Sequence, residues 1–164
     1  MKKLVLLLLG LVLCIGTVGC DNGNNNRGNL EGNLEDILAN IYENAKVDES
    51  FKEFVENGLY TTEITSENVG YFLGKEGLEF ESGIASEPMI SISAYSLCLV
   101  RVKDGTDIAK MKQEIKENAD PRKWICVGVD PQNVIVDNVG DVIILLMSNY
   151  ELEALHNSFL SLGK

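Results

Sequence analysis

A single histidine limits the acid–base chemistry available to this chain. A Ser-His-Asp or Cys-His arrangement would have to use His156, because the sequence contains no other histidine. His156 lies beside Leu152, Leu155 and Phe159 in a pattern with helical spacing, which favours a partly buried structural histidine over a catalytic base. No G-x-S-x-G, H-E-x-x-H, P-loop or C-x-x-C motif occurs. We therefore expect a protein that is not an enzyme and needs no cofactor; a hydrolase using His156 is the least favoured alternative.

Three carboxylates suggest a second kind of chemistry. Glu79 and Glu81 alternate along a predicted strand, and Glu87 follows shortly after. Such groups could bind calcium or another small ligand, because carboxylate oxygens are the ligands that calcium prefers. No further acidic motif completes a cage, so a solvated strand face is the favoured interpretation. A small-ligand or calcium-binding module remains the alternative function.

Two cysteines belong to the folded part of the chain. Cys98 and Cys126 each lie in an apolar run that resembles a strand. Without a nearby histidine they lack the spacing of a zinc site. They could pair as a disulfide in an exported protein, but two buried free thiols are the favoured interpretation.

Two segments have the composition of a partner-binding surface. Residues 86–89 (SEPM) interrupt a predicted strand, and residues 120–124 (DPRKW) contain two cations and the only tryptophan. Arginine and aromatic side chains on a connection are typical of interaction surfaces. The candidate surface consists of Glu87, Met89, Arg122 and Trp124. A structural role, with Trp124 in the core and Arg122 paired with local acids, is the favoured interpretation of these segments.

The N-terminus has the features of an export signal. Lys2 and Lys3 precede an uncharged, mostly apolar run over 4–18, which is too short for a spanning helix and suits a signal peptide. Gly16-Thr17-Val18-Gly19-Cys20 resembles the lipobox of bacterial lipoproteins, although leucine is commoner where Thr17 stands. That resemblance implies cleavage before Cys20, lipidation of its thiol and attachment to the outer face of the cell membrane. Two or more acyl chains would make the attachment stable.

The residues that follow the signal are expected to form a tether. Residues 20–33 are rich in Asn and Gly and poor in core-forming side chains. Loss of 1–19 removes two lysines and no acid, so the formal net charge changes from −11 to −13. This charge argues against nucleic acid as a partner and against electrostatic docking on anionic lipid.

Residues 34–164 have the length of one domain, and their pattern predicts an α+β fold. Helical spacing begins at Leu34 with Asn33 as N-cap, and short helices are expected near 51–58 and over 67–73. Two strands, 78–85 and 95–103, are then expected, followed by a helix that Thr106 caps and that ends before Pro121. Three further strands are expected over 124–129, 134–137 and 142–147. A last helix begins after an S-x-x-E capping box at Ser148 and Glu151. Two strand–strand–helix units predict an antiparallel sheet with both of their helices on one face and the first helix packing elsewhere.

The chain also resembles a family of uncharacterised Firmicute lipoproteins that share a domain of unknown function. The resemblance rests on VRVKDG at 100–105, NADPRKWICVGV at 118–129, NVGDVIILLM at 138–147, SEPM at 86–89 and the signal before Cys20. It implies the outer face of a Gram-positive cell membrane and no activity, ligand or catalytic residue. Taken together, the sequence predicts a lipid-anchored, extracytoplasmic and non-enzymatic binding or accessory module whose partner is a protein or another envelope component.

Overall fold

A computed structural model describes residues 28–90 and 92–164. The predicted signal peptide and Cys20 lie outside the described residues. The helices are α1 (Leu34–Asn44), α2 (Glu49–Gly58), α3 (Val69–Leu73), α4 (Ile108–Asn118) and α5 (Leu152–Ser161), with one 3-10 turn, η1 (Pro131–Asn133). The strands are β1 (Leu59–Glu63), β2 (Ser82–Pro88), β3 (Tyr95–Arg101), β4 (Val134–Val139) and β5 (Val142–Ser148).

The strands form one antiparallel sheet in the order β1-β2-β3-β5-β4, which confirms the predicted α+β class. The two central strands, β3 and β5, pair from Tyr95–Ser148 to Arg101–Val142. Every residue of β5 is buried, because both faces of the sheet are covered. This explains why its sequence is continuously apolar rather than alternating.

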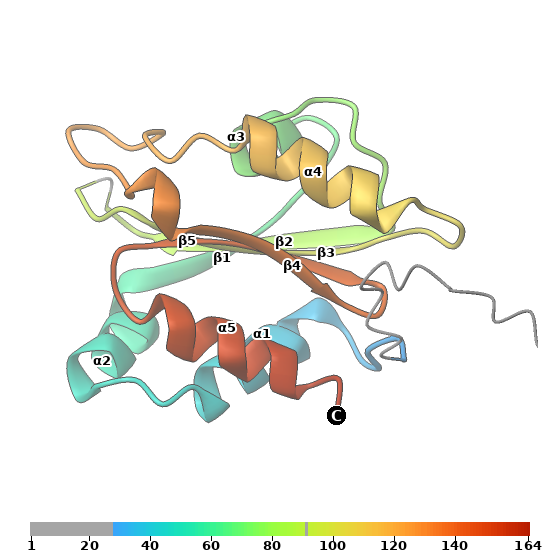
Figure 1. Cartoon of the computed structure of the whole chain (residues 1–164). Coiled ribbons are helices and arrows are strands. Elements are labelled where there is room, and N and C mark those ends of the chain that lie inside the picture. Colours follow the sequence, from blue (N-terminus) through green and yellow to red (C-terminus); the bar gives the residue numbers. More distant parts are fainter. Residues whose placement is uncertain (1–27, 91) are drawn as a thin grey trace, which may run out of the picture.

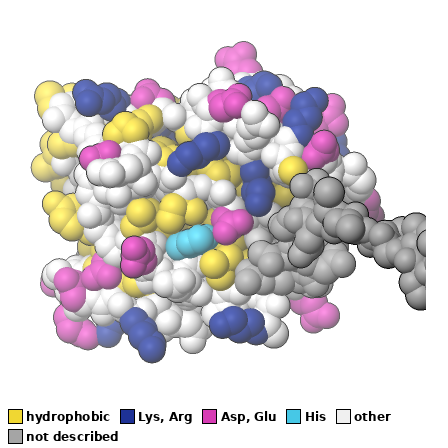
Figure 2. All heavy atoms as spheres, viewed as in Figure 1, with side chains coloured by type: hydrophobic (Ala, Val, Ile, Leu, Met, Phe, Trp, Pro, Cys, Tyr) yellow, Lys and Arg dark blue, Asp and Glu magenta, His cyan; other side chains and the backbone are white. Residues whose placement is uncertain are grey.

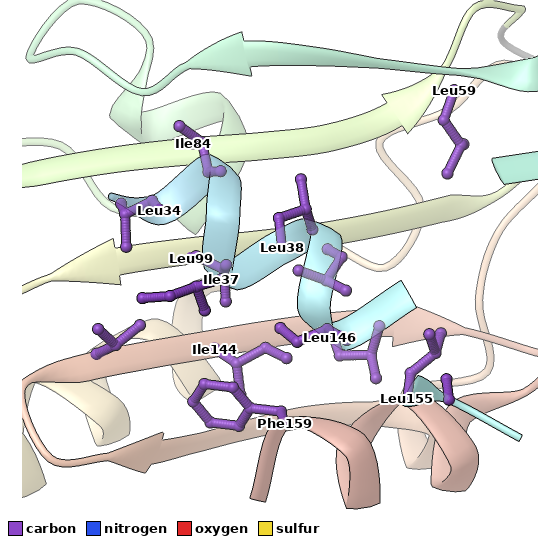
Figure 3. Close-up of a cluster of buried hydrophobic side chains, with 14 of the residues drawn as sticks. Leu34, Ile37, Leu38, Leu59, Ile84, Leu99, Ile144, Leu146, Leu155 and Phe159 are labelled. Carbon is purple, nitrogen blue, oxygen red and sulfur yellow. The ribbon is translucent and has the colours of Figure 1, made fainter. Parts of the chain in front are cut away.

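The helices cover both faces of the sheet (Figure 1). Helices α1, α2 and α5 pack on one face, where Ile37, Ile144 and Phe159 meet (Figure 3). Helices α3 and α4 pack on the other face, around Phe72, Ile115 and Leu145. The prediction that α4 and α5 share a face is therefore wrong. The two strand–strand–helix units are present, but a rotation does not relate them. Helix α4 follows β3 onto one face of the sheet, whereas α5 follows the antiparallel neighbour β5 onto the opposite face.

Helix starts follow the capping residues only in part. Asn33 caps α1 as predicted, by accepting a hydrogen bond from the Asp36 N–H. Helix α4 is capped by Asp107 and not by Thr106. The capping box predicted for α5 does not form, because Ser148 ends β5 and donates its hydroxyl to the Tyr150 carbonyl. None of the helices in the described ranges is long and apolar enough to cross a membrane.

Three strand predictions need correction. Strand β2 begins and ends later than the predicted 78–85, so that Glu87 and Pro88 belong to it. Residues 124–129 form no strand and lie in the connection between α4 and β4. Edge strand β1 was not predicted; its exposed polar side chains carry little apolar alternation.

Candidate functional site

The connections at one end of the sheet bring together the most unusual features of the molecule. We call this end the loop end; it comprises the described residues of three connections, 89–90 with 92–94, 120–130 and 149–151. The opposite end, which we call the Arg101 end, contains the last residue of β3 and the β4–β5 turn (Figure 1). The six residue steps of β3 separate the two ends by about 20 Å.

A groove of about 810 Å³ opens at the loop end. Its volume lies within the range of sites that bind small molecules or single side chains. Phe51, Phe54 and Tyr95 line it with rings 5.8–5.9 Å apart, so its base is aromatic. Ile92 and Tyr150 line it from two different connections.

Two carboxylates stand on the groove, and they are its only charged lining residues among the described parts of the chain. Glu151 Oε1 accepts the Asp48 N–H at 3.2 Å, which ties the start of α2 to the start of α5. Asp48 Oδ1 accepts the Ser50 hydroxyl at 2.7 Å and the Phe51 N–H at 2.8 Å. The bond from Ser50 and then the bond from Phe51 lower the pKa of Asp48, so this group stays ionised.

Backbone strain also occurs at this end. Glu151 has φ 53° and Cys126 has φ 63°, and they are the two non-glycine residues with positive φ in the described ranges. The left-handed conformation costs energy for such residues and often marks functional segments. The Glu151 carboxylate accepts the N–H of Asp48, the N-cap residue of α2, and its own helix has no side-chain cap.

Large apolar side chains are exposed on these same connections. Figure 2 shows hydrophobic side chains along the left edge of the view, which is the side of the loop end in Figure 1. The exposed side chains on these connections are Met89 (60%), Ile90 (57%), Ile92 (70%), Ile125 (68%) and Tyr150 (75%). Five such residues from three connections form a patch of a kind that usually marks an interaction site.

The structure divides the predicted partner surface. Met89 and Arg122 are exposed, as that interpretation requires. Glu87 and Trp124 are only 3% and 8% exposed, so they cannot meet a partner. The segments 86–89 and 120–124 do come together, but their contact is internal.

That internal contact is an ion pair. Lys123 Nζ lies 2.5 Å from Glu87 Oε1, with side chains 5% and 4% exposed. The ammonium also lies 4.6, 5.3 and 5.4 Å from the ring centroids of Tyr71, Phe72 and Trp124. Tyr71 donates its hydroxyl to Glu87 Oε2 at 3.3 Å. Burial, followed by the charge of Glu87, raises the pKa of Tyr71 to about 12. Lys123 thus anchors the 120–130 connection to the sheet.

The three carboxylates predicted to bind calcium do not converge. Glu79 and Glu81 precede β2 and are exposed, and Glu79 pairs with Lys103 at 3.2 Å. Glu87 lies at the far end of β2 and is neutralised by Lys123. No group of three potential metal ligands occurs in the ranges that the structure describes.

The two cysteines remain free thiols, one buried at Cys98 and one exposed at Cys126. Burial raises the pKa of Cys98 to about 11, against the smaller opposing effect of Lys123. The prediction that both would be buried is therefore correct for Cys98 alone.

His156 takes part in a contact at the edge of the sheet. Its Nε2 lies 3.0 Å from Asp137 Oδ2, and Lys112 Nζ lies 3.4 Å from the other oxygen of that carboxylate. Burial raises the pKa of Asp137, but the Asn138 N–H, His156 and Lys112 outweigh burial and hold the pKa below its ordinary value. No serine or cysteine is hydrogen-bonded to His156 among the residues described.

The Arg101 end holds the start of the described chain. Arg101 donates to the carbonyls of Leu30 and Gly32 and pairs with Asp141, which accepts the Leu30 N–H. Gly140 has φ 52°, and a Cβ there would lie 2.4 Å from the Gly28 carbonyl oxygen, so only glycine fits. Residues 28–33, predicted to be part of a free tether, are thus bound to the domain.

Sequence reasoning missed the groove and the role of Lys123. The groove is formed by residues from four separate segments, and only their three-dimensional arrangement brings them together. A lysine beside a tryptophan carries no signal that its ammonium is buried. Scans of protein-family models, curated proteins and solved structures found no match to this chain.

Proposed function

We propose that this chain is a lipid-anchored extracytoplasmic module that binds an envelope protein through its loop end and performs no catalysis. The proposal of an anchor is supported by the signal-like N-terminus and the lipobox-like sequence that ends at Cys20. The predicted resemblance to uncharacterised Firmicute lipoproteins has the same implication and adds no activity.

The position of the exposed apolar patch is the observation that supports binding. The patch occupies the loop end, whereas the chain that leads from Cys20 joins the domain at the Arg101 end. Seven residues, 21–27, separate Cys20 from the bound segment, and the eight steps from Cys20 to Gly28 span at most about 28 Å. An anchor at Cys20 would therefore hold the Arg101 end near the membrane and leave the loop end free for a partner.

The charge of the domain agrees with this arrangement. A net charge of −13 after signal removal repels an anionic membrane, so the domain would not lie flat on the lipid. Aromatic and aliphatic side chains at the loop end are the types that contribute most to protein interfaces.

The test of the anchor is the intact mass and cell fractionation of the protein from its native host, beside a Cys20→Ala variant. The proposal predicts a membrane-bound species that begins at residue 20 and carries at least two acyl chains, which the variant loses. A soluble, unlipidated species cleaved at another residue would refute it.

A further inference from the structure

We infer that the groove at the loop end binds a segment of the partner protein in which an aromatic or long aliphatic side chain is adjacent to a lysine or arginine. This inference rests on the proposed function, because it names the chemistry of the partner at that same surface.

The base of the groove determines the first half of this chemistry. Phe54 is half-buried and packs on the rings of Phe51 and Tyr95, which are only 7% and 2% exposed. Phe54 therefore offers the aromatic contact to a ligand, and the other two rings hold it in place. The Tyr95 hydroxyl is buried and lies 3.0 Å from the Tyr42 hydroxyl, so it does not add polarity to the groove. A volume of about 810 Å³ accommodates a tryptophan or leucine side chain together with its backbone.

The charge of the groove determines the second half. Asp48 and Glu151 line it, and neither lysine nor arginine does so within the described residues. Neither cation of the neighbouring connection lines the groove: the ammonium of Lys123 is buried against Glu87, and Arg122 lines an adjoining hollow that shares Val127 and Gly128 with the groove. An anionic segment would therefore be repelled, whereas a cationic one would find two fixed carboxylates.

Both carboxylates are held in place before a ligand arrives. Each accepts a backbone N–H through one oxygen, and the second oxygen has no partner among the residues described. Fixed charges bind more tightly than mobile ones because less side-chain entropy is lost on association.

A protein segment fits this surface better than a free small molecule. Ile92 and Tyr150 line the groove, and Met89 and Ile90, on the same β2–β3 connection as Ile92, are exposed but do not line it. A ligand confined to the groove would leave those side chains in water. A chain passing through the groove would cover them as well.

The test uses a displayed library of random eight-residue peptides and the protein as its host produces it. If the protein fractionates with the membrane, it is placed in nanodiscs of neutral phosphatidylcholine; if it is soluble, it is used in buffer. Peptides that bind an Ile92→Ser, Tyr150→Ser double variant are removed first. The remaining peptides are then selected for binding to the native protein and sequenced. A Tyr60→Ser variant is the matched control, because Tyr60 is an exposed aromatic on β1 outside the groove.

We expect the selected peptides to combine an aromatic or aliphatic residue with Lys or Arg and to be depleted in Asp and Glu. The double variant should bind a synthesised winner at least about five-fold more weakly, whereas Tyr60→Ser binds it normally. Glu151→Gln should weaken binding about two-fold or more, and 0.5 M salt should remove that difference.

Selection of acidic or uncharged peptides, equal binding by the double variant, or no enrichment at all would each overturn the inference. These outcomes are separate from failure of the anchor, which is read from the fractionation step before any peptide is added. A soluble protein that still selects cationic apolar peptides would refute the anchor and leave the groove chemistry standing.

Discussion

The Glu87–Lys123 ion pair provides a quantitative test of how the loop end is held together. In a double-mutant cycle, Lys123→Met removes the ammonium, Glu87→Leu removes the carboxylate, and the third variant carries both changes. Removing one partner of a buried pair leaves an uncompensated charge, whereas replacing both partners by apolar groups of similar volume is often neutral.

The surroundings of the pair determine the expected magnitudes. Lys123→Met leaves the 4% exposed Glu87 side chain with Tyr71 as its hydrogen-bond donor, and we expect a loss of about 3–5 kcal/mol in the free energy of unfolding. Glu87→Leu leaves Lys123 among three aromatic rings, each worth about 0.5–1 kcal/mol, so the loss should be smaller, about 2–3 kcal/mol. The double variant should lie within about 1 kcal/mol of the native protein.

Urea unfolding measures all four corners of this cycle. With a slope near 2 kcal/mol per molar, a loss of 3 kcal/mol lowers the midpoint by about 1.5 M. The control is Lys103→Met in the exposed pair with Glu79, where side chains are 55% and 81% exposed and the change should stay within about 0.5 kcal/mol. If the two single losses simply add in the double variant, the pair is not coupled and the reasoning is refuted.

Three further predictions concern other parts of the molecule. A maleimide should modify Cys126 in the native protein and leave Cys98 unmodified until the protein unfolds. Mass spectrometry after digestion distinguishes the two thiols, and equal labelling of both would contradict the burial of Cys98. Asp137→Asn should destabilise the protein by about 1–2 kcal/mol at pH 7, because it loses charge-assisted contacts to His156 and Lys112. The native pKa of Asp137 is lowered, so this stabilisation is complete above the unfolded pKa of 3.8 and disappears as the pH falls through the native pKa. If the urea midpoints of the native protein and the variant differ by the same amount at pH 7 and at pH 2.5, the assignment is contradicted. Arg101→Ala should free residues 28–33, so that limited proteolysis cuts there at least ten-fold faster while the core stays resistant; unchanged cleavage would show that Arg101 does not hold the segment.

The sequence predicted the elements whose patterns are strong and local. Continuous apolar character identified β5 as a central strand, and helical spacing with Asn33 identified α1. Prediction failed where tertiary contacts decide the structure. Residues 124–129 have an apolar composition suited to a strand, yet Lys123 and Trp124 are fixed by contacts to other segments and the backbone at Cys126 adopts a left-handed conformation.

The candidate site was less predictable than the fold, for a physical reason. Residues 86–89 and 120–124 were identified as unusual, and they do meet, but Glu87 and Lys123 satisfy each other in the interior. Met89 and Arg122, together with the neighbouring Ile125, stay exposed and are left for a partner. Which side chains of a segment rich in charged and aromatic residues are buried depends on the other segment of the chain that it packs against. A single sequence does not reveal which two segments pack together.

The choice of face was equally invisible in the sequence. Helices α4 and α5 each have one apolar stripe, and either stripe could cover either face of a sheet that is apolar on both sides. The pattern specifies that each helix packs on the sheet, and long-range packing specifies the face.

The orientation of the domain on the membrane is the most direct test of the account. A fluorescent donor on the native thiol of Cys126 reports the distance of the loop end from the membrane. A donor on Asn29→Cys, in a Cys126→Ser background, reports the distance of the Arg101 end. A lipid dye in the membrane is the acceptor for both. The account predicts stronger energy transfer to the lipid dye from position 29 than from position 126, with the two sites at ends about 20 Å apart. Equal or stronger transfer from Cys126 would place the loop end against the membrane and contradict the proposed function.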